Sequence, residues 1–123
     1  MIAMQAHADV QAGICGFRTS VVTSAEGTRL VSFAVQSDCE TVSALAAALT
    51  EHGQFDTFDE IDPRTDGSLM AIVHEHLKGC CAGCAVPVGL FKAMQVAAGL
   101  ALPKDVVIGL SLDRATSAPP DES

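Results

Sequence analysis

The 123-residue chain has no Trp and no Tyr, and its aromatic residues are limited to five Phe. The core must therefore be built from Val, Leu, Ile and Ala, which suits one small domain. No run reaches the ~18 apolar residues that a membrane-spanning helix needs, so no membrane association is expected. Residues 1–7 lack the basic and apolar regions of a signal peptide, which favours a cytoplasmic location.

Basic residues are also scarce. Seven Lys and Arg stand against 15 Asp and Glu, which gives a formal net charge of −8. Nucleic-acid phosphates repel such a surface, so nucleic acid is excluded as an expected partner, whereas a basic protein partner is compatible with it. The chain also lacks a P-loop, a glycine-rich dinucleotide fingerprint and a G-x-S-x-G elbow, which favours a binding protein over an enzyme.

Local patterns predict an α+β fold with the order β-β-β-α-α-α-β. β-Branched and alternating residues predict an extended stretch and two strands at 8–14, 17–25 and 28–36. Helical periodicity and capping residues predict three helices: from the Ser37/Glu40 capping box to His52, from Leu69 to Leu77, and from Pro87 to Gly99. A last strand is predicted at 106–112. We expect an antiparallel sheet with the three helices on one face.

The predicted elements form one unit without an internal repeat or a linker. We expect a single cysteine-containing domain over residues 1–114. Residues 115–123 contain two Pro and no large apolar side chain, which predicts a disordered tail.

Cysteine is the unusual residue that the chain does contain. Three of the five thiols lie in one pentapeptide, Cys80-Cys81-Ala82-Gly83-Cys84. The other two are Cys15, flanked by glycines, and Cys39, which with Cys84 lies at a predicted helix start, where free amides favour thiolate over thiol. Cys15 and Cys39 could instead be small buried hydrophobes. Three thiols in five residues have little value as packing, so the pentapeptide favours a ligand or redox site.

The spacing leaves the ligand open. Four ligands drawn from Cys15, Cys39, Cys84 and one of Cys80 or Cys81 would suit a [4Fe–4S] cluster, a [2Fe–2S] cluster or a single zinc. His76, four residues before Cys80, is either an added ligand or outer-shell donor, or a satisfied boundary histidine. The acidic stretch at 56–62 lacks the spacing of a calcium loop and indicates a solvated loop.

Ile14-Cys15-Gly16, the following hairpin, Asp38-Cys39-Glu40 at a helix start and Cys84 at a later one resemble the IscU/NifU-type iron–sulfur scaffold proteins. The resemblance covers about residues 10–98 and implies that Cys15, Cys39 and Cys84 take the family's ligand positions. Two positions depart from the family: Phe17 replaces an Asp that helps to keep the cluster labile, and Gly83 replaces a His. By this resemblance, Cys80 or Cys81 fills the vacant fourth position.

We therefore expect an iron–sulfur protein with an accessory, electron-transfer, sensing or scaffold-like role, holding its cluster more stably than a delivery scaffold does. One alternative is a zinc or other soft-metal binding protein that uses the same thiolates. The other is a thiol-based sulfur carrier or redox enzyme in which Cys84 is the reactive thiol and Cys80 or Cys81 resolves the product.

Overall fold

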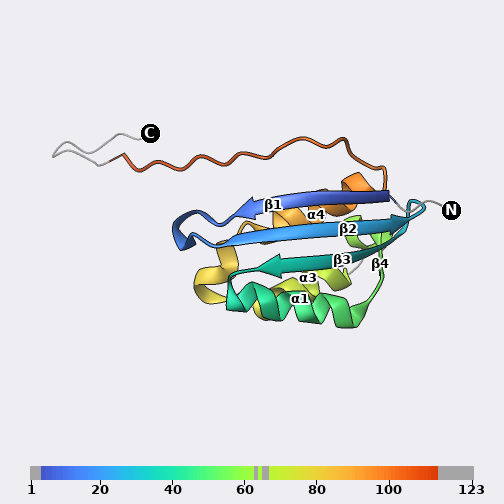
Figure 1. Ribbon diagram of the computed structural model, residues 1–123, viewed down its shortest axis with the longest axis horizontal. Helices are drawn as coiled ribbons and strands as arrows, with labels where there is room; N and C mark the ends of the chain where they lie inside the picture. The colour runs from blue at the N-terminus through green and yellow to red at the C-terminus, as the bar shows by residue number, and fades with distance from the viewer. Residues whose placement is uncertain (1–3, 63, 65–66, 114–123) are drawn as a thin grey trace.

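The computed structural model describes residues 4–62, 64 and 67–113. Its elements, in chain order, are β1 (Met4–Gln11), a 3₁₀ turn (Gly13–Cys15), β2 (Arg18–Glu26), β3 (Leu30–Ser37), α1 (Glu40–His52), β4 (Phe55–Asp56), α2 (Thr57–Ile61), α3 (Ser68–His76), a second 3₁₀ turn (Gly79–Gly83) and α4 (Val86–Ala97). The fold is α+β, with a sheet in one layer and helices in the other (Figure 1).

The sheet is an antiparallel meander in the order β1-β2-β3-β4. β1 pairs with β2 from Met4 opposite Ala25 to Gln11 opposite Arg18. β2 pairs with β3 across a short turn in which Gly27 takes a φ of 69°, a conformation that glycine adopts without steric cost. The strands alternate because one face is buried and the other is not: β2 buries Thr19, Val21, Thr23 and Ala25.

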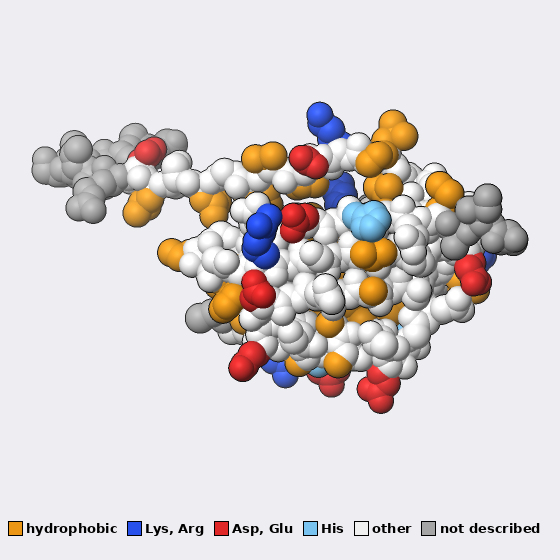
Figure 2. Space-filling view, in the orientation of Figure 1, with side chains coloured by type: hydrophobic (Ala, Val, Ile, Leu, Met, Phe, Trp, Pro, Cys, Tyr) orange, Lys and Arg blue, Asp and Glu red, His pale blue; other side chains and the backbone are white. Residues whose placement is uncertain are grey.

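The helices lie on the buried face, where α4 packs on β1 and β2, α1 packs on β3, and α3 lies against α1. The largest fully buried side chains are Phe55, Leu45, Leu49, Leu69, Leu90 and Met94, so the core is mainly aliphatic, as the composition predicts. Figure 2 looks onto the opposite face of the sheet, which no described helix covers. That face carries mostly small or polar side chains, among them Gln5, Asp9, Ser20, Ser24 and Gln36.

The predicted helix ends agree closely with the structure. α1 ends at His52 before Gly53, as predicted. α4 has Pro87 in its first turn and ends in a Schellman motif, in which the amides of Gly99 and Leu100 bond the carbonyls of Val96 and Gln95.

The start of α1 was predicted too early. Cys39, and not Ser37, is the residue that precedes the helix. Ser37 still pairs with Thr19 in the sheet, and its hydroxyl lies 2.7 Å from the Thr19 hydroxyl. The helix therefore begins only after the chain has left β3.

The predicted strand at 106–112 is wrong for the single chain. Residues 102–113, here called the C-terminal arm, are exposed and have no ladder partner in the described part of the molecule. The prediction failed because alternating apolar side chains show only that a segment is able to form a strand. A strand also needs the edge of a sheet close enough to pair with. The element order also gains β4 and α2, which form part of the acidic stretch predicted as a loop. The tail predicted at 115–123 lies outside the described residues.

Within the described ranges, no helix is both long and apolar enough to cross a membrane.

Candidate thiolate site at one end of the sheet

The connections that carry the cysteines meet at one end of the molecule, here called the cysteine end (at the left in Figure 1). Cys15 lies between β1 and β2, Cys39 between β3 and α1, and Cys80, Cys81 and Cys84 between α3 and α4. The antiparallel meander explains the first two positions, because β1 and β3 run in the same direction and both finish at the cysteine end. The third follows because α3 runs back toward the same end.

Cys15 is held by a tight backbone turn and by little else. The Gly16 amide bonds the Gly13 carbonyl at 2.9 Å, and the Ala12 amide bonds the Phe17 carbonyl at 3.0 Å. Gly13 and Gly16 both have positive φ, which leaves the turn narrow and its thiol on the outside. Cys15 is exposed.

Cys39 lies in the connection between β3 and α1. Its amide donates to the Ser37 hydroxyl at 3.1 Å, and its carbonyl accepts the first helical hydrogen bond, from the Ser43 amide at 2.8 Å. The thiol is half-buried and packs against the hydrophobic core. Its position is therefore fixed by both the sheet and the helix.

The cysteine pentapeptide forms the second 3₁₀ turn and leads into α4. Cys81 and Cys84 are half-buried against the core, while the side chain of Cys80 lies outside the described residues. The Val86 amide, in the first turn of α4, points at the Cys84 sulfur at 3.5 Å. An N–H donor directed at sulfur stabilises negative charge on that atom.

α4 is held against β1 through a glycine. A Cβ on Gly89 would lie 2.6 Å from the Val10 side chain and 3.7 Å from that of Ala8, so only glycine permits this approach. Val10 is near the end of β1 that leads to Cys15, and Gly89 is in the first half of α4, shortly after Cys84. This contact joins the two segments that carry Cys15 and Cys84.

The described side chains do not already form a metal site. Among them, no group of three or more His, Cys, Asp or Glu is placed so that it could hold a metal ion. Cys15, Cys39, Cys81 and Cys84 are free thiols. The structure thus brings the connections to one end, and the predicted convergence of the sulfur atoms stays a prediction.

A family model covers nearly all of the described structure, from residue 6 in β1 to residue 110 in the arm. The chain belongs to a family of unknown function, DUF6951. All five cysteines lie within the matched residues. Searches of curated proteins and of solved structures gave no match.

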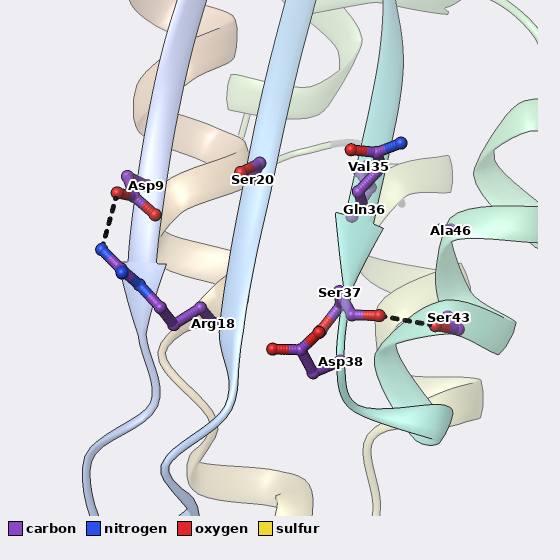
Figure 3. Close-up of a pocket in the computed structure, with 9 residues that line it drawn as sticks. All are labelled: Asp9, Arg18, Ser20, Val35, Gln36, Ser37, Asp38, Ser43 and Ala46. Atoms are coloured by element: carbon purple, nitrogen blue, oxygen red, sulfur yellow. Dashed lines mark hydrogen bonds and ion pairs between the residues drawn. The ribbon is translucent and has the colours of Figure 1, made fainter.

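A polar hollow in this DUF6951 chain adjoins the cysteine end (Figure 3). It is lined by the ends of β1, β2 and β3 and the start of α1: Asp9, Arg18, Ser20, Val35, Gln36, Ser37, Asp38, Ser43 and Ala46. Arg18 and Asp9 form an exposed ion pair at 3.3 Å, and the Ser43 hydroxyl donates to the Ser37 carbonyl at 3.2 Å. Sequence reasoning missed the hollow because its residues share no motif and meet only through strand register.

Two other predicted candidates in the DUF6951 chain make local contacts. The His76 ring nitrogen Nδ1 donates to the Ile72 carbonyl at 3.0 Å, which fixes the ring against its own helix. The other nitrogen, Nε2, is the one that a metal would use, so both predicted roles of His76 stay predictions. In the acidic stretch, the Arg29 guanidinium holds the pKa of Asp56 below its usual value, mainly by a hydrogen bond. Glu60 accepts the amides of Ser68 and Leu69 at the start of α3, while its partial burial raises its pKa.

Proposed function

We propose that this protein binds an iron–sulfur cluster, or another metal held by thiolates, through Cys15, Cys39, Cys84 and one of Cys80 or Cys81. The observation that carries the proposal is the meeting of three cysteine-bearing connections at one end of a small domain. These connections are far apart in sequence, and each follows or precedes a regular element that fixes where it begins.

The chemistry of the donors fits a soft metal. Thiolates are the usual ligands of iron–sulfur clusters and of structural zinc, at metal–sulfur distances of ~2.3 Å. Cys39 and Cys84 are tied to α1 and α4, whereas Cys15 is on an exposed turn. Binding would therefore draw the Cys15 turn toward the two half-buried thiols, and it would involve Cys80 or Cys81 from the neighbouring turn.

The proposed role is to retain a cluster and not to transfer it to another protein. This follows from the resemblance to IscU/NifU-type scaffolds, in which an Asp shortly after the first cysteine helps to keep the cluster labile. The corresponding residue here is Phe17, which cannot be a ligand and is 42% exposed. Four thiolates beside an apolar residue favour stable retention, which suits electron transfer, sensing or an accessory function.

A second candidate is a sulfur carrier, favoured by the Val86 amide that is directed at the Cys84 sulfur. In this reaction the Cys84 thiolate attacks the terminal sulfur of a persulfide donor, and the donor leaves as a thiolate. The product is a persulfide on Cys84, and no metal is required. A protein of this type is colourless and contains no bound iron.

The deciding experiment is anaerobic purification followed by iron, sulfide and zinc analysis, visible absorption and intact-mass measurement. Bound iron and sulfide with thiolate-to-iron absorption support the cluster, whereas zinc alone supports the soft-metal alternative. One added sulfur atom on Cys84 supports the carrier. A colourless protein that binds neither metal after reconstitution contradicts the proposal.

Single Cys→Ser variants provide matched controls. Cys15→Ser, Cys39→Ser and Cys84→Ser should each lose most of the bound metal, while one of Cys80→Ser and Cys81→Ser should lose little. Adjacent residues point in different directions, so a relaxed turn presents only one of these two to a common centre. Complete loss in both would indicate a bridged, binuclear site.

A further inference from the structure

The C-terminal arm leaves the domain after α4 with its apolar side chains in solvent. Its six large apolar residues are 50–92% exposed: Leu102, Val106, Val107, Ile108, Leu110 and Leu112. Figure 1 shows the arm as an extended trace, and Figure 2 shows apolar side chains standing out along it. A contiguous apolar stretch of this kind marks a surface that is normally covered.

The sheet has a matching gap at β1. This strand pairs only with β2 in the described part of the chain, so its outer edge presents unpaired amide and carbonyl groups. β1 has eight residues, and at ~3.3 Å per residue its length equals that of residues 105–112 in extended form. A free edge of this length is a template for an added strand.

The side-chain pattern of the arm matches the two faces of the sheet at this edge. Val106, Ile108, Leu110 and Leu112 alternate with Val107, Gly109 and Ser111. On β1, the side toward α4 carries Ala6, Ala8 and Val10, of which Ala8 and Val10 are only half-buried. A strand with its even-numbered residues on that side would cover Ala8 and Val10, and Val107, Gly109 and Ser111 would join the opposite, polar face.

We propose that the arm of one copy pairs with the β1 edge of a second copy, and that a reciprocal exchange forms a two-fold symmetric dimer. Both halves of the contact are in every chain, so one symmetric exchange covers both arms and both edges at once. The family model spans residues 6–110, so nearly all of β1 and most of the arm lie within the matched residues. This inference is independent of the metal proposal.

A second copy is favoured over the chain's own edge because the arm already extends along its own domain without a hydrogen bond to β1. It is favoured over an unrelated peptide because the arm itself supplies the complementary alternation and length.

The test is the solution mass of the full chain by sedimentation equilibrium, combined with hydrogen exchange of β1 and of residues 105–112. We expect a dimer with slow exchange in both segments. The variant Ile108→Asp/Leu110→Asp should raise the dimer dissociation constant by about a hundredfold or more, because it buries two unpaired charges in each copy of the contact. Exchange in both segments should then become fast.

The matched control is Val107→Asp/Ser111→Asp, which adds the same charge on the side of the arm that faces solvent in the proposed pairing. It should remain dimeric. Both variants should keep the circular dichroism of the folded domain, because the arm is exposed in the single chain.

Three results would overturn the exchange. The first is a wild-type monomer with fast exchange in the arm. The second is a monomer in which β1 and the arm are protected, which would mean that the arm pairs with its own chain. The third is a dimer that the Ile108→Asp/Leu110→Asp variant leaves unchanged, which would place the interface elsewhere.

Discussion

The two ends of the sheet are built differently. At the end opposite the cysteines, here called the β4 end, Arg29 forms an ion pair with Asp56 at 2.8 Å and lies 4.7 Å above the Phe58 ring. Asp56 also accepts the Phe58 amide and so caps α2. Buried Phe55 packs edge-on against Phe33.

At the cysteine end, backbone turns replace most of these side-chain contacts. The Cys15 turn is closed by two backbone hydrogen bonds, one between Gly16 and Gly13 and one between Ala12 and Phe17, and Ile14 at its tip is fully exposed. The thiols of Cys39 and Cys84 are half-buried, and among the described residues each of these two takes part in a single hydrogen bond that involves a side-chain atom.

The difference separates stability from binding. Buried rings and capped helices fix one end of the domain, which leaves loops at the other end able to adjust to a ligand. Changes at the β4 end should therefore alter unfolding and leave metal content unchanged. Changes at the cysteine end should lower metal content and leave the unfolding of the metal-free protein nearly unchanged.

The largest expected effect on unfolding comes from Phe55→Ala. The ring is 2% exposed and stacks 4.0 Å from His52, so its removal should cost about 3–5 kcal/mol in the free energy of unfolding. The matched variant at the other end, Phe17→Ala, should cost less than about 1 kcal/mol because that side chain is 42% exposed and lies outside the buried core. Urea titration of both variants measures the contrast. Equal losses would break the comparison.

The next effect is the stabilisation by bound metal. Because the proposed ligands come from three separate connections, loading should raise the melting temperature by at least ~5 °C, which corresponds to more than ~1 kcal/mol in a domain of this size. Melting of loaded and metal-free protein under anaerobic, reducing conditions tests this. Cys84→Ser should abolish the difference, and midpoints within ~2 °C of each other for the wild type would argue against a metal centre that ties the connections together.

A smaller effect is expected where α4 meets β1. Gly89→Ala places a Cβ against Val10, at an overpacking cost of ~1–3 kcal/mol, from which the better helix propensity of Ala subtracts up to ~1 kcal/mol. The net loss should be about 1 kcal/mol, and metal affinity should fall because α4 moves with Cys84. Gly83→Ala is the control: it has no atom within 4 Å of the new Cβ and should change stability by less than ~0.5 kcal/mol.

The smallest effect is a pH dependence at the β4 end. The hydrogen bond from Arg29 lowers the folded-state pKa of Asp56 below 3.8, so the carboxylate stabilises the fold above that value. This contribution is lost as the pH falls through the folded pKa. Asp56→Asn retains a helix-capping side chain but cannot titrate. The stability difference between wild type and variant should therefore be constant at neutral pH and shrink below pH 3.8, as measured by chemical denaturation.

Helix boundaries were the most predictable part of the fold. The residues that mark these boundaries are Gly53 after α1, and Pro87 and Gly99 around α4. Glycine and proline start or end a helix through the conformation of their own backbone, so the residue type alone is enough to predict the boundary. β4 was not predictable in this way. It has only two residues, and it exists because Phe55 and Asp56 pair with Val31 and Leu30, more than twenty positions earlier.

For the candidate site, too, the local features were predictable and the long-range ones were not. Cys15, Cys39 and Cys84 lie next to turn and helix signals, so their place at chain reversals follows from local patterns. Whether these three residues lie at the same end of the molecule depends on the strand order and on the direction of α3, which local patterns do not give. The polar hollow beside Asp38 depends on register across three strands, which no local pattern specifies.

The packing of α4 on β1 also sets the order in which the domain folds. The contacts within the meander and between β3 and α1 join segments that are close in sequence. The contact between Val10 and Gly89 instead closes a loop over most of the length of the chain. Loop closure over such a separation is entropically costly, and contacts of this kind form late. The docking of α4 is therefore expected to come after the sheet is in place. Newly made chains would then display Cys15 and Cys39 before α4 brings Cys84 to the same end of the sheet, so under the proposed function the cofactor would be acquired only once folding is complete.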